Sequence, residues 1–158
     1  MNVNHVLPSG FVDEFTRLAS NPDPELATSA LLIARLGYPR LDPAPYLAKL
    51  DKMGEAVAER LSETDGPGTP HGPIDLLNRY LFHDQGFTGN TNEYEDPRNS
   101  FLNQVLERRT GIPITLALVY IEVARRAGVR VDGVNFPGHF LLRFPLGTEH
   151  DHNSAVFV

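Results

Sequence analysis

The sequence predicts an α+β fold in which a helical N-terminal half precedes a small antiparallel sheet. Through most of residues 11–127, apolar residues recur every three or four positions, which is the spacing of one helix face. From residue 129 onward, the chain holds short runs of β-branched and aromatic residues separated by turn residues. Helices followed by strands in this way are typical of α+β domains.

Length and composition fit one ordinary globular domain. The chain has 158 residues, of which 41% are hydrophobic and 22% are charged, and a chain of this size can bury a core of its own. The formal net charge is −6, which argues against nucleic acid as a partner, because Lys and Arg must neutralise its phosphates. Cys is absent, so no disulfide and no Cys-based metal site can form.

The first half predicts three helices separated by proline and glycine. The first is expected over residues 11–19, and the second has Asp23 as its N-cap and ends near Gly37. The third runs from about residue 42 to Leu61 on a clear apolar stripe.

A loop over residues 62–73 is predicted next, because this stretch holds three Pro and three Gly. We expect it to separate a helical region, residues 1-65, from a core region, residues 72-158, with the two forming one compact unit. A helix over residues 74–86 follows, and then a polar segment over residues 88–99. A polar loop of that length is often functional.

The most apolar helix is predicted from Pro113 to Ala127. Before it, Asn99 or Ser100 is expected to cap a short helix that Gly111 ends. Only the last turns of the apolar helix carry charge, so we expect it to be the central buried helix.

Three strands are predicted after this helix, over residues 129–136, 139–144 and 155–158. Gly128 ends the helix, and Pro137-Gly138 forms the turn between the first two strands. The third run reaches the last residue without a turn or polar tail, so we expect the sequence to be a C-terminally truncated piece of a longer protein.

Five short stretches in the second half of the sequence together form a recognisable pattern. They are Tyr80-Leu81-Phe82, Gly86-Phe87-Thr88-Gly89-Asn90, Asp96-Pro97-Arg98-Asn99-Ser100, Leu106-Glu107-Arg108-Arg109-Thr110-Gly111-Ile112-Pro113 and Gly133-Val134-Asn135-Phe136-Pro137-Gly138-His139-Phe140. Over about 65 residues, the sequence resembles the bacterial SirB-type family of transglutaminase-like proteins. The resemblance implies a papain-like core, and longer members of that family continue into a tetratricopeptide-like tail.

The resemblance also implies a Cys nucleophile at the start of the central helix and a His base on the next strand in active members. Here Pro113 stands at the nucleophile position and His139 at the histidine position, while the orienting acid would lie on or beyond Val158. Proline has neither a nucleophilic atom nor an N–H donor. We therefore expect a pseudoenzyme: a non-catalytic domain that binds a protein or peptide partner, without a cofactor or a metal.

The polar loop supplies the candidate binding residues Asn90, Tyr94, Asp96 and Asn99. Two interpretations stay open for them. The loop forms a recognition surface beside His139, or its own Asn and Asp side chains hold its turns.

Arg108 and Arg109 are further candidate binding residues. With Arg125 and Arg126 they belong either to a solvated charged face or to a basic patch. The net charge of −6 makes nucleic acid the weakest of the possible partners for such a patch.

An alternative function is an atypical hydrolase in which His139 activates a water, assisted by a metal on His150 and His152. Of the two hydroxyls near the site, Thr115 should point elsewhere on its helix and Ser100 should serve as a helix cap. We expect a cytoplasmic protein, with neither a signal peptide nor a membrane span. The sequence specifies neither the ligand nor the oligomeric state.

Overall fold

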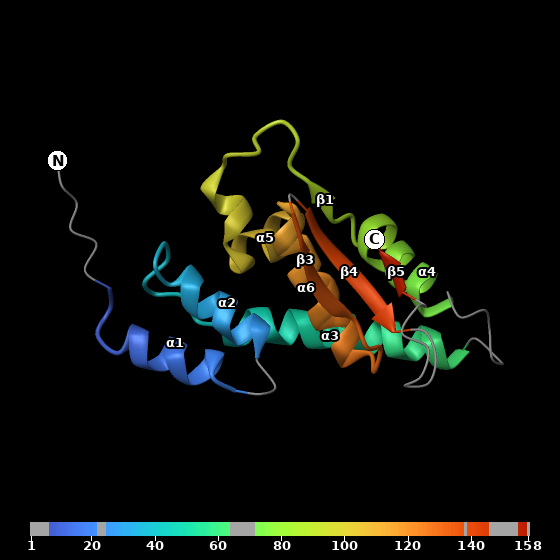
Figure 1. The fold of residues 1–158 in the computed structure, drawn as a ribbon, viewed down its shortest axis with the longest axis horizontal. Helices are drawn as coiled ribbons and strands as arrows, with labels where there is room; N and C mark the ends of the chain where they lie inside the picture. The colour runs from blue at the N-terminus through green and yellow to red at the C-terminus, as the bar shows by residue number, and fades with distance from the viewer. Residues whose placement is uncertain (1–6, 22–24, 64–71, 138, 146–154, 158) are drawn as a thin grey trace.

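A computed structural model describes residues 7–21, 25–63, 72–137, 139–145 and 155–157 of the chain. In this part, α-helices combine with two small sheets, which confirms the α+β class (Figure 1). None of the described helices is long and apolar enough to cross a membrane.

Helices α1 (Phe11–Ala19) and α2 (Leu26–Ala34) pack on each other at the N-terminal edge of the molecule (Figure 1). The predicted cap of the second helix is wrong. Its N-cap is Glu25, which makes no side-chain capping bond, and Asp23 lies outside the described residues. The helix also ends earlier than Gly37, and the Tyr38 N–H donates to the Ala34 carbonyl across the following turn.

The long helix α3 (Ala44–Glu63) crosses α6 (Pro113–Arg126) at close range. Gly54 allows this approach, because a Cβ at that position would lie 2.3 Å from the Cβ of Arg126. The glycine is therefore required by packing rather than by backbone conformation.

The segment predicted as one helix after the loop is two elements, α4 (Gly72–Asn78) and a π-helix, η1 (Arg79–Asp84). The Gln85 N–H donates to the Tyr80 carbonyl at 2.8 Å, which is an i to i+5 hydrogen bond. Such π-helical turns are rare and frequently lie at functional sites.

Strands β1 (Thr88–Gly89) and β2 (Thr110–Gly111) pair in parallel and enclose the polar loop, η2 (Pro97–Ser100) and α5 (Leu102–Arg108). Two predictions are wrong here. Phe101, not Asn99 or Ser100, is the N-cap of α5, because the two polar residues are already part of η2. Gly111 does not end α5, since the chain leaves the helix at Arg109, whose φ is +57°.

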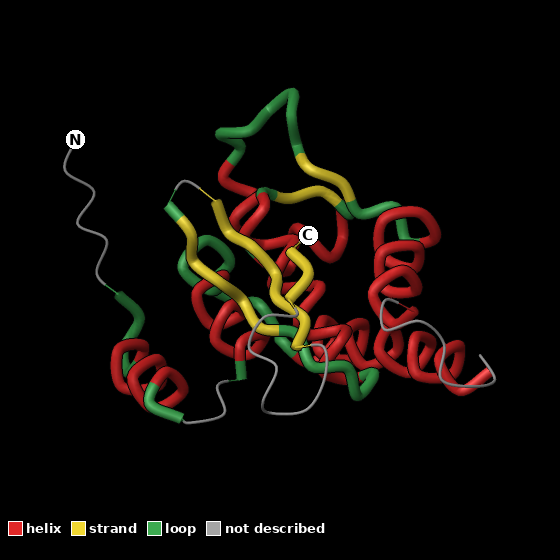
Figure 2. The backbone as a smooth tube through the Cα atoms, turned by 45° about the vertical axis from the view of Figure 1, so that its right-hand side comes forward, coloured by secondary structure: helices red, strands yellow, loops and turns green. Residues whose placement is uncertain are grey.

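Helix α6 is the central buried helix, as predicted, with Val119, Tyr120, Val123 and Ala124 almost fully buried. It packs against α2, α3 and α5 and against the sheet of β3 (Asp132–Phe136), β4 (His139–Pro145) and β5 (Ala155–Phe157). This sheet is antiparallel in the order β3-β4-β5, and both views show it lying on one side of the helices (Figures 1 and 2).

The first strand of this sheet begins at Asp132 rather than Val129, because the Val129 N–H still closes α6 by donating to the Ala124 carbonyl. One core cluster contains buried residues from α2, α3, α4, α5, α6 and β4. The predicted division into residues 1-65 and 72-158 stays a prediction.

Candidate functional site

The start of α6 is built around the Thr115 hydroxyl. The Ile112 N–H donates to Thr115 Oγ1 at 3.1 Å, and the same oxygen lies 2.8 Å from the Asn99 carbonyl oxygen and 3.0 Å from that of Ile112. Pro113 is the first helical residue and brings no N–H. Thr115 is buried and its hydroxyl is engaged in capping, so this hydroxyl is not available as a nucleophile.

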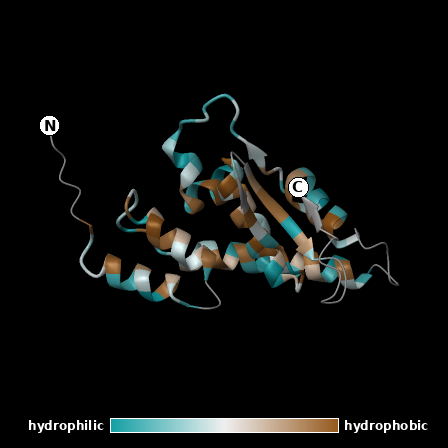
Figure 3. Ribbon diagram, in the orientation of Figure 1, coloured by the Kyte–Doolittle hydropathy of each residue, from teal (hydrophilic) through white to brown (hydrophobic). Residues whose placement is uncertain are grey.

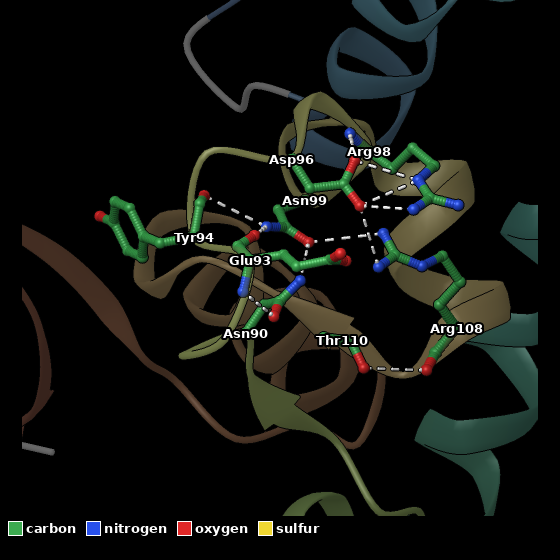
Figure 4. Close-up of polar contacts among 8 residues, drawn as sticks. All are labelled: Asn90, Glu93, Tyr94, Asp96, Arg98, Asn99, Arg108 and Thr110. Atoms are coloured by element: carbon green, nitrogen blue, oxygen red, sulfur yellow. Dashed lines mark hydrogen bonds and ion pairs between the residues drawn. The ribbon is translucent and has the colours of Figure 1, made fainter.

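Asn99 is the centre of the polar loop (Figure 4). Its side chain is fully buried, and its Nδ2 donates to the carbonyl oxygens of Glu93 at 2.8 Å and Tyr94 at 3.2 Å. Its Oδ1 accepts from Asn90 Nδ2 at 3.1 Å and from Arg108 Nη1 at 3.4 Å. Asn99 thus ties both ends of the loop to α5.

Asp96 forms a second cluster with two arginines. Its carboxylate accepts from the Arg98 N–H at 2.9 Å and pairs with the Arg98 guanidinium at 2.7 Å, and Arg108 approaches it at 3.4 Å. The hydrogen bonds from the Arg98 side chain and backbone lower the pKa of Asp96 to about 2. The carboxylate is therefore charged at any physiological pH and serves as the N-cap of η2.

The base of the loop is closed by backbone pairing. The Thr88 N–H donates to the Arg109 carbonyl and the Asn90 N–H donates to the Gly111 carbonyl, while Asn90 Oδ1 accepts from the Glu93 N–H at 2.9 Å. The side chains of Asn90, Asp96, Asn99 and Arg108 therefore point into the loop, as Figure 4 shows. This geometry favours the interpretation that the loop is held by its own side chains.

Two apolar side chains stay exposed on this rigid frame. Tyr94 is 62% exposed and points away from the network (Figure 4), and Ile114, in the first turn of α6, is 52% exposed. Both are anchored to Asn99, one through the Tyr94 carbonyl and the other through the neighbouring Thr115 hydroxyl. The loop is hydrophilic over most of its length (Figure 3), and Tyr94 adds an exposed aromatic ring to it.

The loop also has a hollow of about 560 Å³ over residues 91–98. Apart from Tyr94 and Pro97, its lining is polar or charged. Hollows of this volume are within the range of ligand sites. What the arrangement offers chemically is hydrogen-bonding and aromatic contact on a preformed surface.

The predicted histidine lies on the strand that begins after the hairpin turn. His139 is the first residue of β4 and pairs with Phe136. Because β3 follows the end of α6 and Gly133 lies against Ile121, this hairpin runs back along α6 (Figure 1). The His139 side chain, like His150 and His152, lies outside the described residues, so its role stays a prediction.

Of the arginines expected on a solvated face or in a basic patch, Arg125 is exposed and Arg126 is partly buried, and both pair with Glu122. Arg126 donates to Asp51 at 2.6 Å and to Glu122, and Arg125 pairs with the same glutamate at 3.2 Å. Glu122 is 1% exposed, and one of its oxygens, Oε1, has no hydrogen-bond partner among the residues that the structure describes. Sequence reasoning missed Glu122, although a glutamate three and four residues before two arginines on an apolar helix is a signal of a buried pair.

A family model described as the transglutaminase-like superfamily matches residues 44–158. A UPF0162 protein of Xylella fastidiosa is 51% identical over 122 residues, which cover 77% of this chain and 42% of that protein. A UPF0162 protein of Pseudomonas aeruginosa is 40% identical over 128 residues, covering 81% of this chain and 46% of that protein. F-box only protein 21 of Mus musculus is 47% identical over 76 residues, or 48% of this chain and 12% of that protein.

The chain therefore spans less than half the length of the curated relatives it matches. No solved structure matches it significantly. The finer assignment to a SirB-type family with a tetratricopeptide-like tail stays a prediction.

Proposed function

Because this chain belongs to the transglutaminase-like superfamily, we propose that it keeps the framework of that superfamily as a binding domain for a protein or peptide partner and performs no acyl transfer. The 158 residues contain no Cys. Pro113 begins the central helix, where we predict the thiol of an active member to lie. A thiolate placed at a helix N-terminus is the basis of nucleophilic catalysis in such a site, and proline cannot replace it.

The observation that carries the binding role is the combination of a rigid loop with an exposed aromatic side chain. The side chains of Asn99 and Asp96 already hold the loop in one conformation, so the loop loses little conformational entropy on binding. Tyr94 and Ile114 remain exposed next to backbone groups that Asn99 contacts or neighbours. Tyrosine on a preformed surface is enriched at binding hot spots, because its large ring contacts a partner with little loss of side-chain entropy.

The peptide would lie along the start of α6, with an apolar or aromatic side chain against Tyr94 and Ile114. The peptide backbone would then hydrogen-bond to polar residues that line the neighbouring hollow and do not hold the loop, namely Thr91, Asn92 and Glu95. In this proposal Asn90, Asp96, Asn99 and Arg108 position the loop rather than contact the partner.

The binding role is tested with a displayed library of random peptides selected on the immobilised protein. We expect enriched peptides whose affinity falls about tenfold or more on Tyr94→Ala, the range of an aromatic hot spot, and also falls on Ile114→Asp. Tyr46→Phe, which alters a tyrosine on α3, serves as the control. Failure to enrich any peptide, or peptides that bind Tyr94→Ala equally well, would contradict this role.

The absence of catalysis is tested separately by incubating the protein with a fluorescent primary amine and glutamine-containing peptides, with and without a chelator. We expect no amine incorporation and no hydrolysis above the rate of His139→Ala. Turnover that is lost in His139→Ala would overturn the pseudoenzyme proposal. If that turnover also required a metal, the atypical hydrolase would replace it.

A further inference from the structure

A second hollow, of about 370 Å³, lies between α3, η1 and the end of α5 and carries an excess of positive charge. We call it the Arg109 pocket. Lys49 and Lys52 line it from one turn of α3, and Arg109 lines it from the residue after α5. Glu107 is the single carboxylate in its lining. On a chain with a net charge of −6, a cavity with three cations and one anion points to an anionic ligand.

These cations lack protein counter-charges. Within the described ranges, no carboxylate lies within 4 Å of the charged nitrogens of Lys49, Lys52 or Arg109. Arg108, the preceding residue, is by contrast paired with Asp96. Glu107 is itself engaged, because its Oε1 accepts from the Tyr46 hydroxyl at 2.6 Å.

The guanidinium of Arg109 is held in place by neutral groups. Its Nη1 donates to both the backbone and the side-chain oxygens of Gln85, at 2.5 and 2.6 Å, and its plane lies 5.4 Å from the centre of the Phe87 ring. Since a guanidinium has five N–H donors, these contacts fix its position while leaving donors for an incoming oxygen. Arginine is suited to such a site because its planar fork matches carboxylate and phosphate oxygens.

Two unfavourable backbone conformations meet at this pocket. Arg109 has a φ of +57°, a left-handed conformation that a glycine would adopt more easily. The π-helix η1 turns Tyr80 into the pocket and places Gln85 directly after it. Strained backbone is concentrated at functional sites, where a required side-chain position outweighs local stability.

The rest of the lining suits an apolar body with one polar end. Met53, Phe87 and Leu106 are buried and supply apolar contacts. Tyr80 is buried, and no hydrogen bond of its hydroxyl occurs among the described residues. Burial raises the pKa of this hydroxyl, so it stays a proton donor.

We propose that the Arg109 pocket binds a small organic anion, a carboxylic acid or a phosphate ester with a compact apolar body. The anionic oxygens would accept from Arg109 and Tyr80, with Lys49 and Lys52 at the entrance. The apolar body would rest on Phe87, a volume of about 370 Å³ being at the small end of the range for such ligands. This inference does not depend on the peptide site at α6.

The test uses four probes on the whole chain: benzoate, phenyl phosphate, inorganic phosphate and neutral benzamide. Binding is followed by calorimetry and by the NMR signal of the Arg109 side-chain Nε–H. We expect benzoate or phenyl phosphate to bind and to shift this signal, with affinity falling as salt rises. Preference for phenyl phosphate would identify the ligand as a phosphate ester, and preference for benzoate as a carboxylic acid. Benzamide binding as tightly as benzoate would overturn the proposal, as would binding of none of the probes.

Three variants separate a ligand-binding role from a structural one. Arg109→Gly removes the guanidinium and suits the positive φ, so we expect a folded protein whose affinity falls about tenfold or more, the usual effect of losing a charged hydrogen bond. Arg109→Lys keeps the charge without the fork and should weaken binding as well. Glu107→Gln keeps the acceptor for Tyr46 but removes the negative charge, so it should strengthen binding severalfold. The control, Arg17→Ala on the exposed side of α1, should change affinity little.

Unchanged affinity in both Arg109 variants would overturn the proposal. So would an equal loss in Arg17→Ala, because the effect would then come from net charge alone. If Arg109→Gly fails to fold, the opposite changes expected for Arg109→Lys and Glu107→Gln still decide the question.

Discussion

Truncating the central asparagine of the loop, Asn99→Ala, should destabilise the protein much more than truncating an equally buried asparagine nearby. Asn99 and Asn103 are 0% and 2% exposed, and both changes remove the same atoms, so the loss of packing is similar. Asn99 makes three side-chain hydrogen bonds of 2.8 to 3.2 Å. Asn103 interacts with Tyr46, while its side-chain Oδ1 has no hydrogen-bond partner within the described part of the chain.

The difference between the two variants follows from this count. Even without the long 3.4 Å contact to Arg108, two more hydrogen bonds are lost at Asn99, each with a net contribution of about 1 kcal/mol. At position 103, within α5, alanine also gains about 0.5 kcal/mol of helix propensity. Asn99→Ala should therefore be less stable than Asn103→Ala by about 2.5 kcal/mol, or roughly 5–10 °C in Tm for a domain of this size.

Urea unfolding followed by circular dichroism measures this difference, and amide hydrogen exchange locates it. Because Asn99 ties down the Glu93 and Tyr94 carbonyls, exchange should accelerate over residues 90–99 in Asn99→Ala alone. Equal unfolding free energies for the two variants, with no change of exchange in the loop, would refute the idea that Asn99 organises it.

Gly54→Ala should lower the free energy of unfolding in urea by roughly 1–3 kcal/mol, because the new Cβ would clash with Arg126 of α6. The control is Gly72→Ala, whose Cβ would meet nothing within 4 Å. Equal unfolding free energies for the two variants would contradict the close crossing of α3 and α6. The pKa of Asp96 is lowered from 3.8 to about 2, chiefly by Arg98, so its contribution to stability is fully present above about pH 4 and is lost as the pH falls through 2. Asp96→Asn should flatten acid unfolding between these values, and an unchanged acid profile would argue against the ion pair. The hydrogen bond to Glu107 raises the pKa of Tyr46 from 10.0 to about 12. The contribution of this hydrogen bond to folding stability is therefore fully present below pH 10 and is lost as the pH rises through 12. Burial also raises the pKa of Tyr80 and Tyr120, so ultraviolet titration should show several late tyrosinates, with one fewer in Tyr46→Phe. If Tyr46→Phe instead loses a tyrosinate that titrates near pH 10, this hydrogen bond is absent.

Periodicity predicted most of the fold, because the apolar spacing of α3 and α6 directly reflects burial against a core. The structure of the polar loop was harder to predict from the sequence. Asn99 looks like a helix cap from sequence, since asparagine before an apolar run usually is one. Its actual role depends on carbonyl groups of Glu93 and Tyr94 that the loop brings back beside it, and side-chain identity alone carries no information on that approach.

Arg109 illustrates a second limit of sequence reasoning. Glycine is the expected residue where a helix ends in a left-handed conformation, so Gly111 was predicted to end α5, and that prediction was wrong. Nothing in the sequence marks an arginine as the residue that adopts this conformation. A non-glycine residue in this place becomes informative only when the structure shows what its side chain reaches, here Gln85 and Phe87.

The left-handed turn at Arg109 also explains how two consecutive arginines reach two separate places beside one short ladder. Arg108 ends α5 and reaches Asn99 and Asp96 in the polar loop. Arg109 reverses the backbone into β2 and reaches Gln85 in the Arg109 pocket. The two arginines point to different places because Arg109, the one residue between helix and strand, turns their side chains apart. A glycine at position 109 would make the same turn at lower conformational cost, so what an arginine adds at this position is its side chain, in keeping with the ligand role proposed for the Arg109 pocket.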